Sequence, residues 1–118
     1  MNLFIKEDFI SHAGLPLTWK VECDALTEKD YEALAKIVSE KITFCDVKGI
    51  PRGGIPFEKA LKKYCTYNES DPLLICDDVY TTGTSMREVY EEGAIGIVVF
   101  ARNEINDDWI KAIWQIAI

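Results

Sequence analysis

The sequence lacks several features that would have indicated other classes of protein. It contains one histidine and no CxxC pair, so the usual zinc-ligand spacings are absent. No apolar run approaches the roughly 20 residues that cross a bilayer. A formal net charge of −7 leaves no basic excess, which argues against nucleic acid and anionic membranes as partners. A small anionic ligand is still compatible with this charge, because a few local donors can hold it.

The N-terminus and the cysteines favour a cytoplasmic protein. Charged residues at positions 6–8 stand where a signal peptide would need its apolar stretch. The four cysteines are widely spaced, and without an export signal they are expected to be reduced thiols. They are Cys23, Cys45, Cys65 and Cys76.

The length and the pattern of apolar residues predict one α/β domain over residues 1–118. Strand and helix patterns alternate from about Asp46 to the end, an order that produces a small doubly wound, mainly parallel sheet with right-handed crossovers. Thr27 is the expected N-cap of a first helix, and Gly93 the expected end of a later one. The expected strands are 19–23, 46–50, 73–76, 95–101 and 113–118, and the expected helices follow Thr27 and cover 57–64, 82–92 and 107–111.

The run LLICDDVYTTGTS at residues 73–85 carries the main functional signal. An apolar strand ends in two carboxylates, and a hydroxyl-rich loop leads into a helix. In an open parallel sheet, ligands bind at the carboxyl ends of the strands, where backbone N–H groups suit a phosphate. The loop hydroxyls add donors, and Gly83 allows close approach of the backbone. This loop therefore predicts a phosphate site.

Asp77 and Asp78 precede that loop, and their acceptor oxygens suit ribose hydroxyls or the water shell of Mg²⁺. A ribose that bears a phosphate satisfies both halves of the run. The alternative is structural: the two acids form a turn at the end of a strand and the hydroxyls only cap the helix.

These residues resemble a known family. DDVYTTGTS, preceded by LLIC, is similar to the phosphoribosyl-pyrophosphate motif of the type I phosphoribosyltransferases. VKGIPRGGIP, at residues 47–56, is similar to the pyrophosphate-binding loop of orotate phosphoribosyltransferase and its relatives. The two matches occur in the order of the family, and they imply its α/β fold.

The resemblance also implies roles for individual residues. Asp77 and Asp78 would hold the ribose hydroxyls and, with Arg52, make up the catalytic set. Mg²⁺ would bridge pyrophosphate and sugar, without direct protein ligands. The 5-phosphate would be bound by Thr81, Thr82, Gly83, Thr84 and Ser85, and the pyrophosphate by Ile50, Pro51, Arg52 and Gly53.

The base site is less defined by the sequence. Arg102 follows an apolar strand and is a candidate to contact the base, with a solvated charge at a strand end as the alternative. His12, the single histidine, is a candidate for acid–base chemistry in a segment with Ser11 and Gly14, or a surface residue.

The predicted function is Mg²⁺-dependent transfer of ribose 5-phosphate from phosphoribosyl pyrophosphate to a nucleobase. A homodimer is one assembly that the resemblance implies. Catalytic members usually carry a long closing loop between the two motifs, and residues 62–72 leave little room for one. A module that binds phosphoribosyl pyrophosphate or a nucleotide without turnover is therefore the alternative. A third reading is a different phosphosugar or nucleotide binder on a similar sheet.

Overall fold

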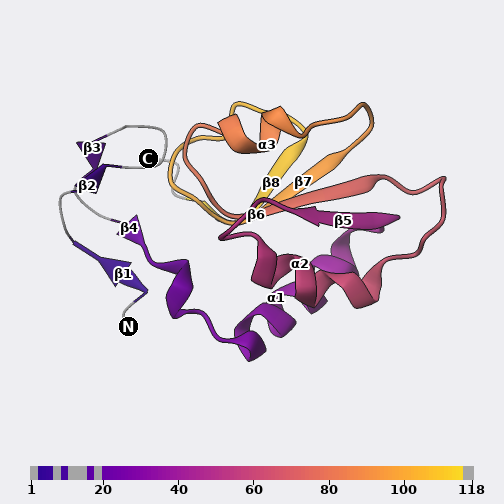
Figure 1. The fold of residues 1–118 in the computed structure, drawn as a ribbon, viewed down its shortest axis with the longest axis horizontal. Coiled ribbons are helices and arrows are strands. Elements are labelled where there is room, and N and C mark those ends of the chain that lie inside the picture. The colour runs from indigo at the N-terminus through magenta and orange to yellow at the C-terminus, as the bar shows by residue number, and fades with distance from the viewer. Residues whose placement is uncertain (1–2, 7–8, 11–15, 18–19, 116–118) are drawn as a thin grey trace.

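The computed structural model describes residues 3–6, 9–10, 16–17 and 20–115. Their central feature is a parallel sheet of four strands in the order β5-β6-β7-β8 (Figure 1). Two small antiparallel pairs, β1-β4 and β2-β3, precede it in the chain. The elements are β1 (Phe4–Ile5), β2 (Phe9–Ile10), β3 (Pro16–Leu17), β4 (Lys20–Val21), η1 (Cys23–Ala25), α1 (Glu28–Lys41), β5 (Asp46–Gly49), α2 (Ile55–Leu61), η2 (Lys62–Tyr64), β6 (Leu73–Tyr80), α3 (Thr84–Glu88), β7 (Ile95–Ala101) and β8 (Ile110–Gln115).

Helix α1 begins as the sequence predicts. The Thr27 hydroxyl accepts the N–H of Asp30, and the Asp30 carboxylate accepts the N–H of Thr27, which together form a capping box. These hydrogen bonds lower the pKa of Asp30. The apolar stripe of the helix is buried against α2 and the sheet, where the rings of Tyr31 and Phe57 lie 5.9 Å apart.

The sheet is covered on both faces, which confirms the predicted α/β architecture. Helices α1 and α2 pack on the face that carries Leu74 and Cys76. Helix α3 packs through Met86 on the opposite face, which carries Ile75 and Val98. Figure 1 shows α1 and α2 below the sheet and α3 above it. The buried strands are apolar on both sides, as is usual for a parallel sheet.

The prediction of right-handed crossovers is correct for only one of the first two connections. Strand β6 lies beside β5, and β7 lies on the far side of β6, so both connections step across the sheet in the same direction. Their helices, α2 and α3, lie on opposite faces. Two such connections have opposite hands, and one of them therefore has the rare left hand.

Several elements also differ from the prediction, and three of these differences bear on the site. Strand β6 runs on to Tyr80, because its pairing with β7 continues beyond the apolar residues as far as Tyr80 and Ala101. Helix α3 stops at Glu88 instead of reaching residue 92, because the Val89 N–H turns back to the Met86 carbonyl. The expected helix at 107–111 is wrong, since β8 begins at Ile110 and pairs there with β7.

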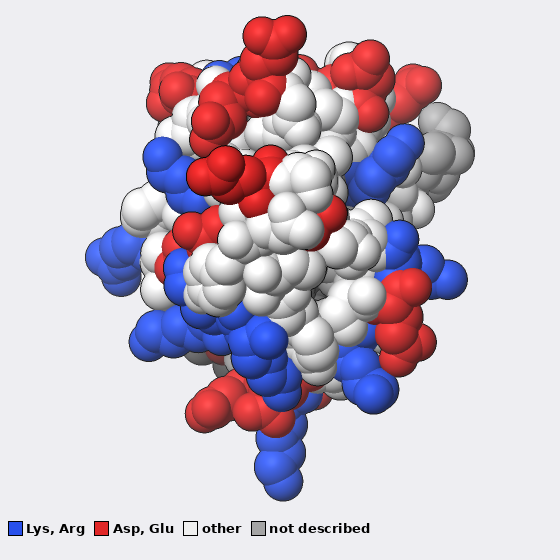
Figure 2. Space-filling model, turned by 90° about the vertical axis from the view of Figure 1, so that its right-hand side faces the viewer, with Lys and Arg blue, Asp and Glu red and all other residues white. Residues whose placement is uncertain are grey.

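The charged side chains are unevenly distributed on the face that Figure 2 shows. Figure 2 shows Asp and Glu gathered mainly over the upper layer, which holds α3, and Lys and Arg mainly over the lower layers, which hold α1 and α2. The lysines of α2 and η2 are exposed, and Lys62 pairs with Asp46 at 3.0 Å. No helix in the part of the chain that the structure describes is long and apolar enough to cross a membrane.

Candidate phosphoribosyl site at the carboxyl edge of the sheet

The first part of the site is the turn that follows β5. The Ile50 N–H donates to the Cys76 carbonyl at 2.9 Å, and the Gly54 N–H closes the turn on the Ile50 carbonyl at 2.8 Å. Glu58 supports the turn from α2, since its Oε1 accepts the N–H of Gly49 at 3.0 Å. The peptide bond between Pro51 and Arg52 is cis.

This turn presents some of the predicted pyrophosphate residues to solvent. Pro51 and Arg52 are exposed, so the guanidinium is free to fork two donors onto phosphate oxygens. Ile50 is buried, and its N–H and carbonyl are both used within the protein. Residues 51–53 are therefore better placed than Ile50 to contact a pyrophosphate.

The turn lies directly against the acidic pair of β6. A Cβ atom built on Gly53 would sit 2.3 Å from Asp78 Oδ2 and 2.6 Å from its Cγ. Distances below 3.0 Å are essentially never seen for real Cβ atoms. Only glycine therefore lets the turn approach the Asp78 carboxylate this closely, and the two sequence motifs meet at this point.

Asp77 and Asp78 lie within the last half of β6 and are both partly buried. Each carboxylate accepts the N–H of the next residue at 2.8 Å. Burial, and then the adjacent Asp78 carboxylate, raise the pKa of Asp77 well above its ordinary value. The pair therefore resists carrying two negative charges, and a ligand that supplies hydroxyl donors or a cation would relieve that repulsion.

The hydroxyl-rich loop follows at residues 81–85. Gly83 is buried in the left-handed region, with φ of 79°. The side chains of Thr84 and Ser85 are exposed, and the Thr82 and Thr84 hydroxyls lie 3.0 Å apart. Helix α3 has only five residues, so its dipole adds little; an anion here would depend on the hydroxyls and the backbone N–H groups.

Arg102 lies at the carboxyl end of β7, next to the same edge. Its N–H donates to the Tyr80 carbonyl at 2.9 Å. The residue is only 8% exposed, and this burial lowers the pKa of its guanidinium. The alternative of a solvated charge at a strand end is therefore wrong. Ser11, His12 and Gly14 lie outside the described residues.

Sequence reasoning missed the residues that support the two loops. Glu58 lies in the helix expected at 57–64 but had no assigned role, and Asp107 was expected in a helix that is not present. Asp107 instead accepts hydrogen bonds from Tyr80 and Arg87, which precede it by 27 and 20 residues. No local pattern could have shown these contacts, because they exist only once the sheet has formed.

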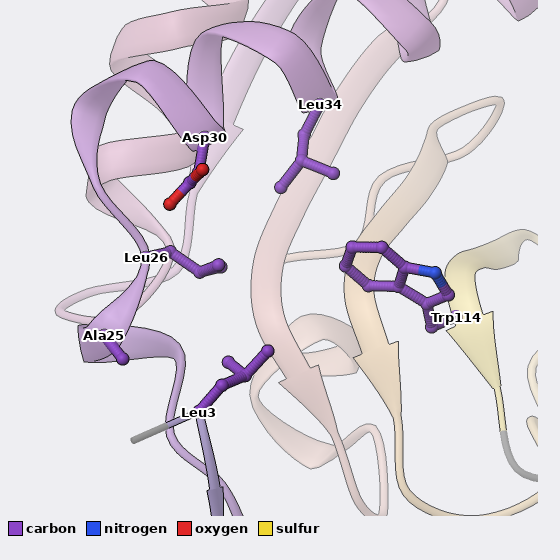
Figure 3. Close-up of a pocket in the computed structure, with 6 residues that line it drawn as sticks. All are labelled: Leu3, Ala25, Leu26, Asp30, Leu34 and Trp114. Carbon is purple, nitrogen blue, oxygen red and sulfur yellow. The ribbon is translucent and has the colours of Figure 1, made fainter. Parts of the chain in front are cut away.

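A separate cavity of about 380 Å³ lies between η1, the start of α1 and β8 (Figure 3). Figure 3 shows the side chains of Leu26 and Leu34 directed towards the ring of Trp114. Among the described residues that line it, the one charged group is Asp30, whose carboxylate caps α1. An apolar cavity with a single acid is unsuited to a phosphate, and it shares no residue with the carboxyl-edge site.

The fold matches solved structures of orotate phosphoribosyltransferases. The crystal structure of that enzyme from Aeropyrum pernix has a TM-score of 0.65 and 18% identity, over 96% of this chain and 88% of that one. The Leishmania donovani UMP synthase structure has a TM-score of 0.71 and 14% identity, over 97% of this chain and 34% of that one. The Mycobacterium tuberculosis H37Rv orotate phosphoribosyltransferase, in complex with Fe(III) dicitrate, has a TM-score of 0.64 and 12% identity, over 98% of this chain and 90% of that one. No protein-family model matches the sequence, and neither does any curated protein.

These matches define the class of fold. A four-stranded parallel sheet flanked by helices, in this arrangement, is the fold of the type I phosphoribosyltransferases. The resemblance that the two sequence motifs indicated is thus confirmed for the fold. At identities this low, the shared fold by itself specifies neither the ligand nor the reaction.

Proposed function

We propose that this chain binds phosphoribosyl pyrophosphate at the carboxyl edge of its sheet and transfers ribose 5-phosphate to a nucleobase. The observation that carries the proposal is the contact between Gly53 and the Asp78 carboxylate. It brings the candidate pyrophosphate turn and the candidate ribose residues together at the edge where open parallel sheets bind ligands. The fold shared with solved orotate phosphoribosyltransferases supports the same assignment.

Each group of residues in the site would contact a different part of the ligand. Asp77 and Asp78 would accept hydrogen bonds from the two ribose hydroxyls. The hydroxyls and N–H groups of residues 81–85 would hold the 5-phosphate, and Arg52 would bind the pyrophosphate. Arg102 would meet the base, or a carboxylate on it.

The reaction requires positioning and charge stabilisation and no covalent nucleophile. A ring nitrogen of the base forms a bond to C1 of the ribose, while the bond from C1 to the pyrophosphate oxygen breaks. Arg52 and the N–H groups of its turn would stabilise the negative charge that develops on the leaving pyrophosphate. The acidic pair would hold the ribose so that C1 faces the base.

Mg²⁺ fits this site as a partner of the ligand. Groups of three or more His, Cys, Asp or Glu that could surround a metal ion are absent from residues 3–6, 9–10, 16–17 and 20–115. Mg²⁺ accepts the oxygens of pyrophosphate, ribose and water as its ligands, and the neighbouring carboxylates can accept hydrogen bonds from its water shell. When bound, Mg²⁺ would neutralise charge on the pyrophosphate and on the acidic pair.

A second candidate is a module that binds phosphoribosyl pyrophosphate without turnover, and the chain between the two motifs favours it. The Thr66 and Tyr67 N–H groups donate to the carbonyls of Phe44 and Cys45. The Cys45 N–H in turn donates to the Pro72 carbonyl. Residues 65–72 are thereby held at the amino ends of β5 and β6, whereas the site lies at the carboxyl ends of the strands. They are not placed to close over a ligand and exclude water.

Calorimetry with phosphoribosyl pyrophosphate and Mg²⁺, followed by pyrophosphate release with a panel of bases that includes orotate, tests both candidates. Binding with release identifies a transferase, and binding without release identifies the module. Absence of binding, with ribose 5-phosphate and pyrophosphate also failing to bind, would contradict the proposal.

A further inference from the structure

The loop at residues 81–85 is supported from its inner side by a cluster of three side chains. Asp107 Oδ2 accepts the Tyr80 hydroxyl at 2.8 Å and the Arg87 Nη1 group at 2.8 Å. The Asn106 N–H donates to the Tyr80 oxygen at 3.2 Å. We call Tyr80, Arg87 and Asp107 the loop support. Tyr80 is the last residue of β6, just before the loop, and Arg87 lies in α3, just after it. Asp107 lies in the connection between β7 and β8.

Two of the three side chains of the loop support, Asp107 and Tyr80, are largely buried. The Asp107 side chain is 12% exposed and Tyr80 is 2% exposed, whereas the Arg87 side chain is 47% exposed. A carboxylate with two donors, one of them charged, is held firmly in such a place. The charge of Arg87 also offsets the negative charge of Asp107, which would otherwise repel an anion bound to the loop.

Gly83 rests directly on this cluster. A Cβ atom on Gly83 would lie 2.6 Å from Asp107 Oδ2, 2.6 Å from a ring carbon of Tyr80 and 2.8 Å from Arg87 Nη1. The left-handed residue of the loop is thus in contact with all three members of the loop support. Its backbone position is set by them and not by the loop residues alone.

The same connection between β7 and β8 holds the start of the loop. The Asn103 Nδ2 group donates to the Thr81 carbonyl at 3.3 Å. The inner side of the loop is therefore occupied by protein contacts, while Thr84 and Ser85 stay exposed on the other side. A loop held in this way keeps its N–H and hydroxyl groups in one arrangement before a ligand arrives, which lowers the entropy cost of binding.

We propose that Asp107 is a positioning residue that holds loop 81–85 in the shape that binds the 5-phosphate. The inference rests on the proposed function for the identity of the ligand, and on the contacts of the loop support for the positioning. It assigns a role in phosphate binding to the connection between β7 and β8, which carries neither of the two motifs.

The test uses Asp107→Ala, which removes both hydrogen bonds, and Tyr80→Phe, which removes one and keeps the ring. Asp71→Ala is the matched control, because that carboxylate also accepts a hydroxyl, from Thr66 at 2.6 Å, in the segment held at the amino ends of the strands. Calorimetry is run with ribose 5-phosphate and, separately, with pyrophosphate and Mg²⁺. We expect affinity for ribose 5-phosphate to fall about tenfold or more in Asp107→Ala and less in Tyr80→Phe, while affinity for pyrophosphate stays within about twofold. The control variant should bind both ligands as the wild type does.

A second measurement needs no ligand. Hydrogen exchange of the backbone amides of residues 82–86 should be about tenfold or more faster in Asp107→Ala than in the wild type, and unchanged in Asp71→Ala. If Asp107→Ala does not fold, Tyr80→Phe provides both measurements. Equal affinity and equal exchange in the variants and the wild type would overturn the inference, as would equal losses for both ligands. If the wild type binds neither ligand, the proposed function fails, and faster loop exchange in the variants would still support the positioning role.

Discussion

Gly53→Ala should separate ligand binding from folding at the point where the two motifs meet. The added Cβ would lie 2.3 Å from Asp78 Oδ2, where contacts below 3.0 Å are essentially never seen. The backbone at Gly53 is outside the left-handed region, so the conformation itself accepts alanine. The clash is with the end of a side chain, and the Asp78 carboxylate can relieve it by rotating away from the turn.

The expected costs follow from that movement. Overpacking of this kind typically costs about 1 to 3 kcal/mol, and the reduced entropy of the unfolded chain offsets up to about 1 kcal/mol. A net loss of about 1 to 2 kcal/mol in the free energy of unfolding should leave the chain folded. A hydrogen bond to a charged group contributes about 1.5 to 3 kcal/mol, so displacing the Asp78 carboxylate should weaken ligand binding about 10- to 100-fold.

Gly93→Ala is the matched control. Gly93 has φ of 86° and no atom within 4 Å of a built Cβ, so the variant loses stability through backbone strain alone, by about 1 to 2 kcal/mol. Urea unfolding and calorimetry with phosphoribosyl pyrophosphate and Mg²⁺ are measured on both variants. Similar losses of stability with loss of affinity only in Gly53→Ala would support the site. Wild-type affinity in Gly53→Ala would refute the reasoning that the turn and Asp78 act on one ligand.

Three further predictions concern the acids and hydroxyls of the site. The double variant Asp77→Asn with Asp78→Asn should abolish binding of phosphoribosyl pyrophosphate and keep a cooperative melt; wild-type affinity would remove the ribose assignment. Thr82→Ala with Thr84→Ala should weaken binding of ribose 5-phosphate and leave pyrophosphate binding unchanged, and an equal loss for both ligands in calorimetry would count against a phosphate loop. Because the folded-state pKa of Asp77 is raised, the folded chain holds that proton more tightly than the unfolded chain, and stability from this group is lost as pH rises from about 4 towards the raised pKa. Asp77→Asn should therefore gain melting temperature over the wild type at pH 8 but not at pH 4, and a gain that does not grow with pH would show that Asp77 ionises normally.

The position of residues 65–72 bears on which candidate function is correct. Residues 65–72 are tied to Phe44 and Cys45 at the amino ends of the strands, so reaching the site would require breaking several backbone hydrogen bonds. A transferase built on this chain would need water excluded by some other segment or by a second subunit. Such an arrangement fits the predicted homodimer, whose test is the oligomeric state with and without phosphoribosyl pyrophosphate.

Much of the local structure followed from short-range patterns in the sequence. The cap at Thr27 and the apolar stripe of α1 depend on residues three or four positions apart, and the structure has both. The buried strand cores, such as Ile95–Ala101, were visible as continuous apolar runs. The two motifs at residues 47–56 and 73–85 indicated the fold because their chemistry and order are encoded along the chain.

Tertiary contacts decided the rest. Strand β6 continues through Asp77 and Asp78 because β7 supplies hydrogen-bonding partners, and polar residues gave no local sign of that pairing. The opposite hands of two successive crossovers depend on which face each helix covers. The meeting of Gly53 with Asp78 and of Gly83 with Asp107 joins residues far apart in sequence. The sequence alone therefore determined which groups are available to the proposed site. Only the packed sheet determined which of them lie together, because such proximity arises from strand order and loop support and not from spacing along the chain.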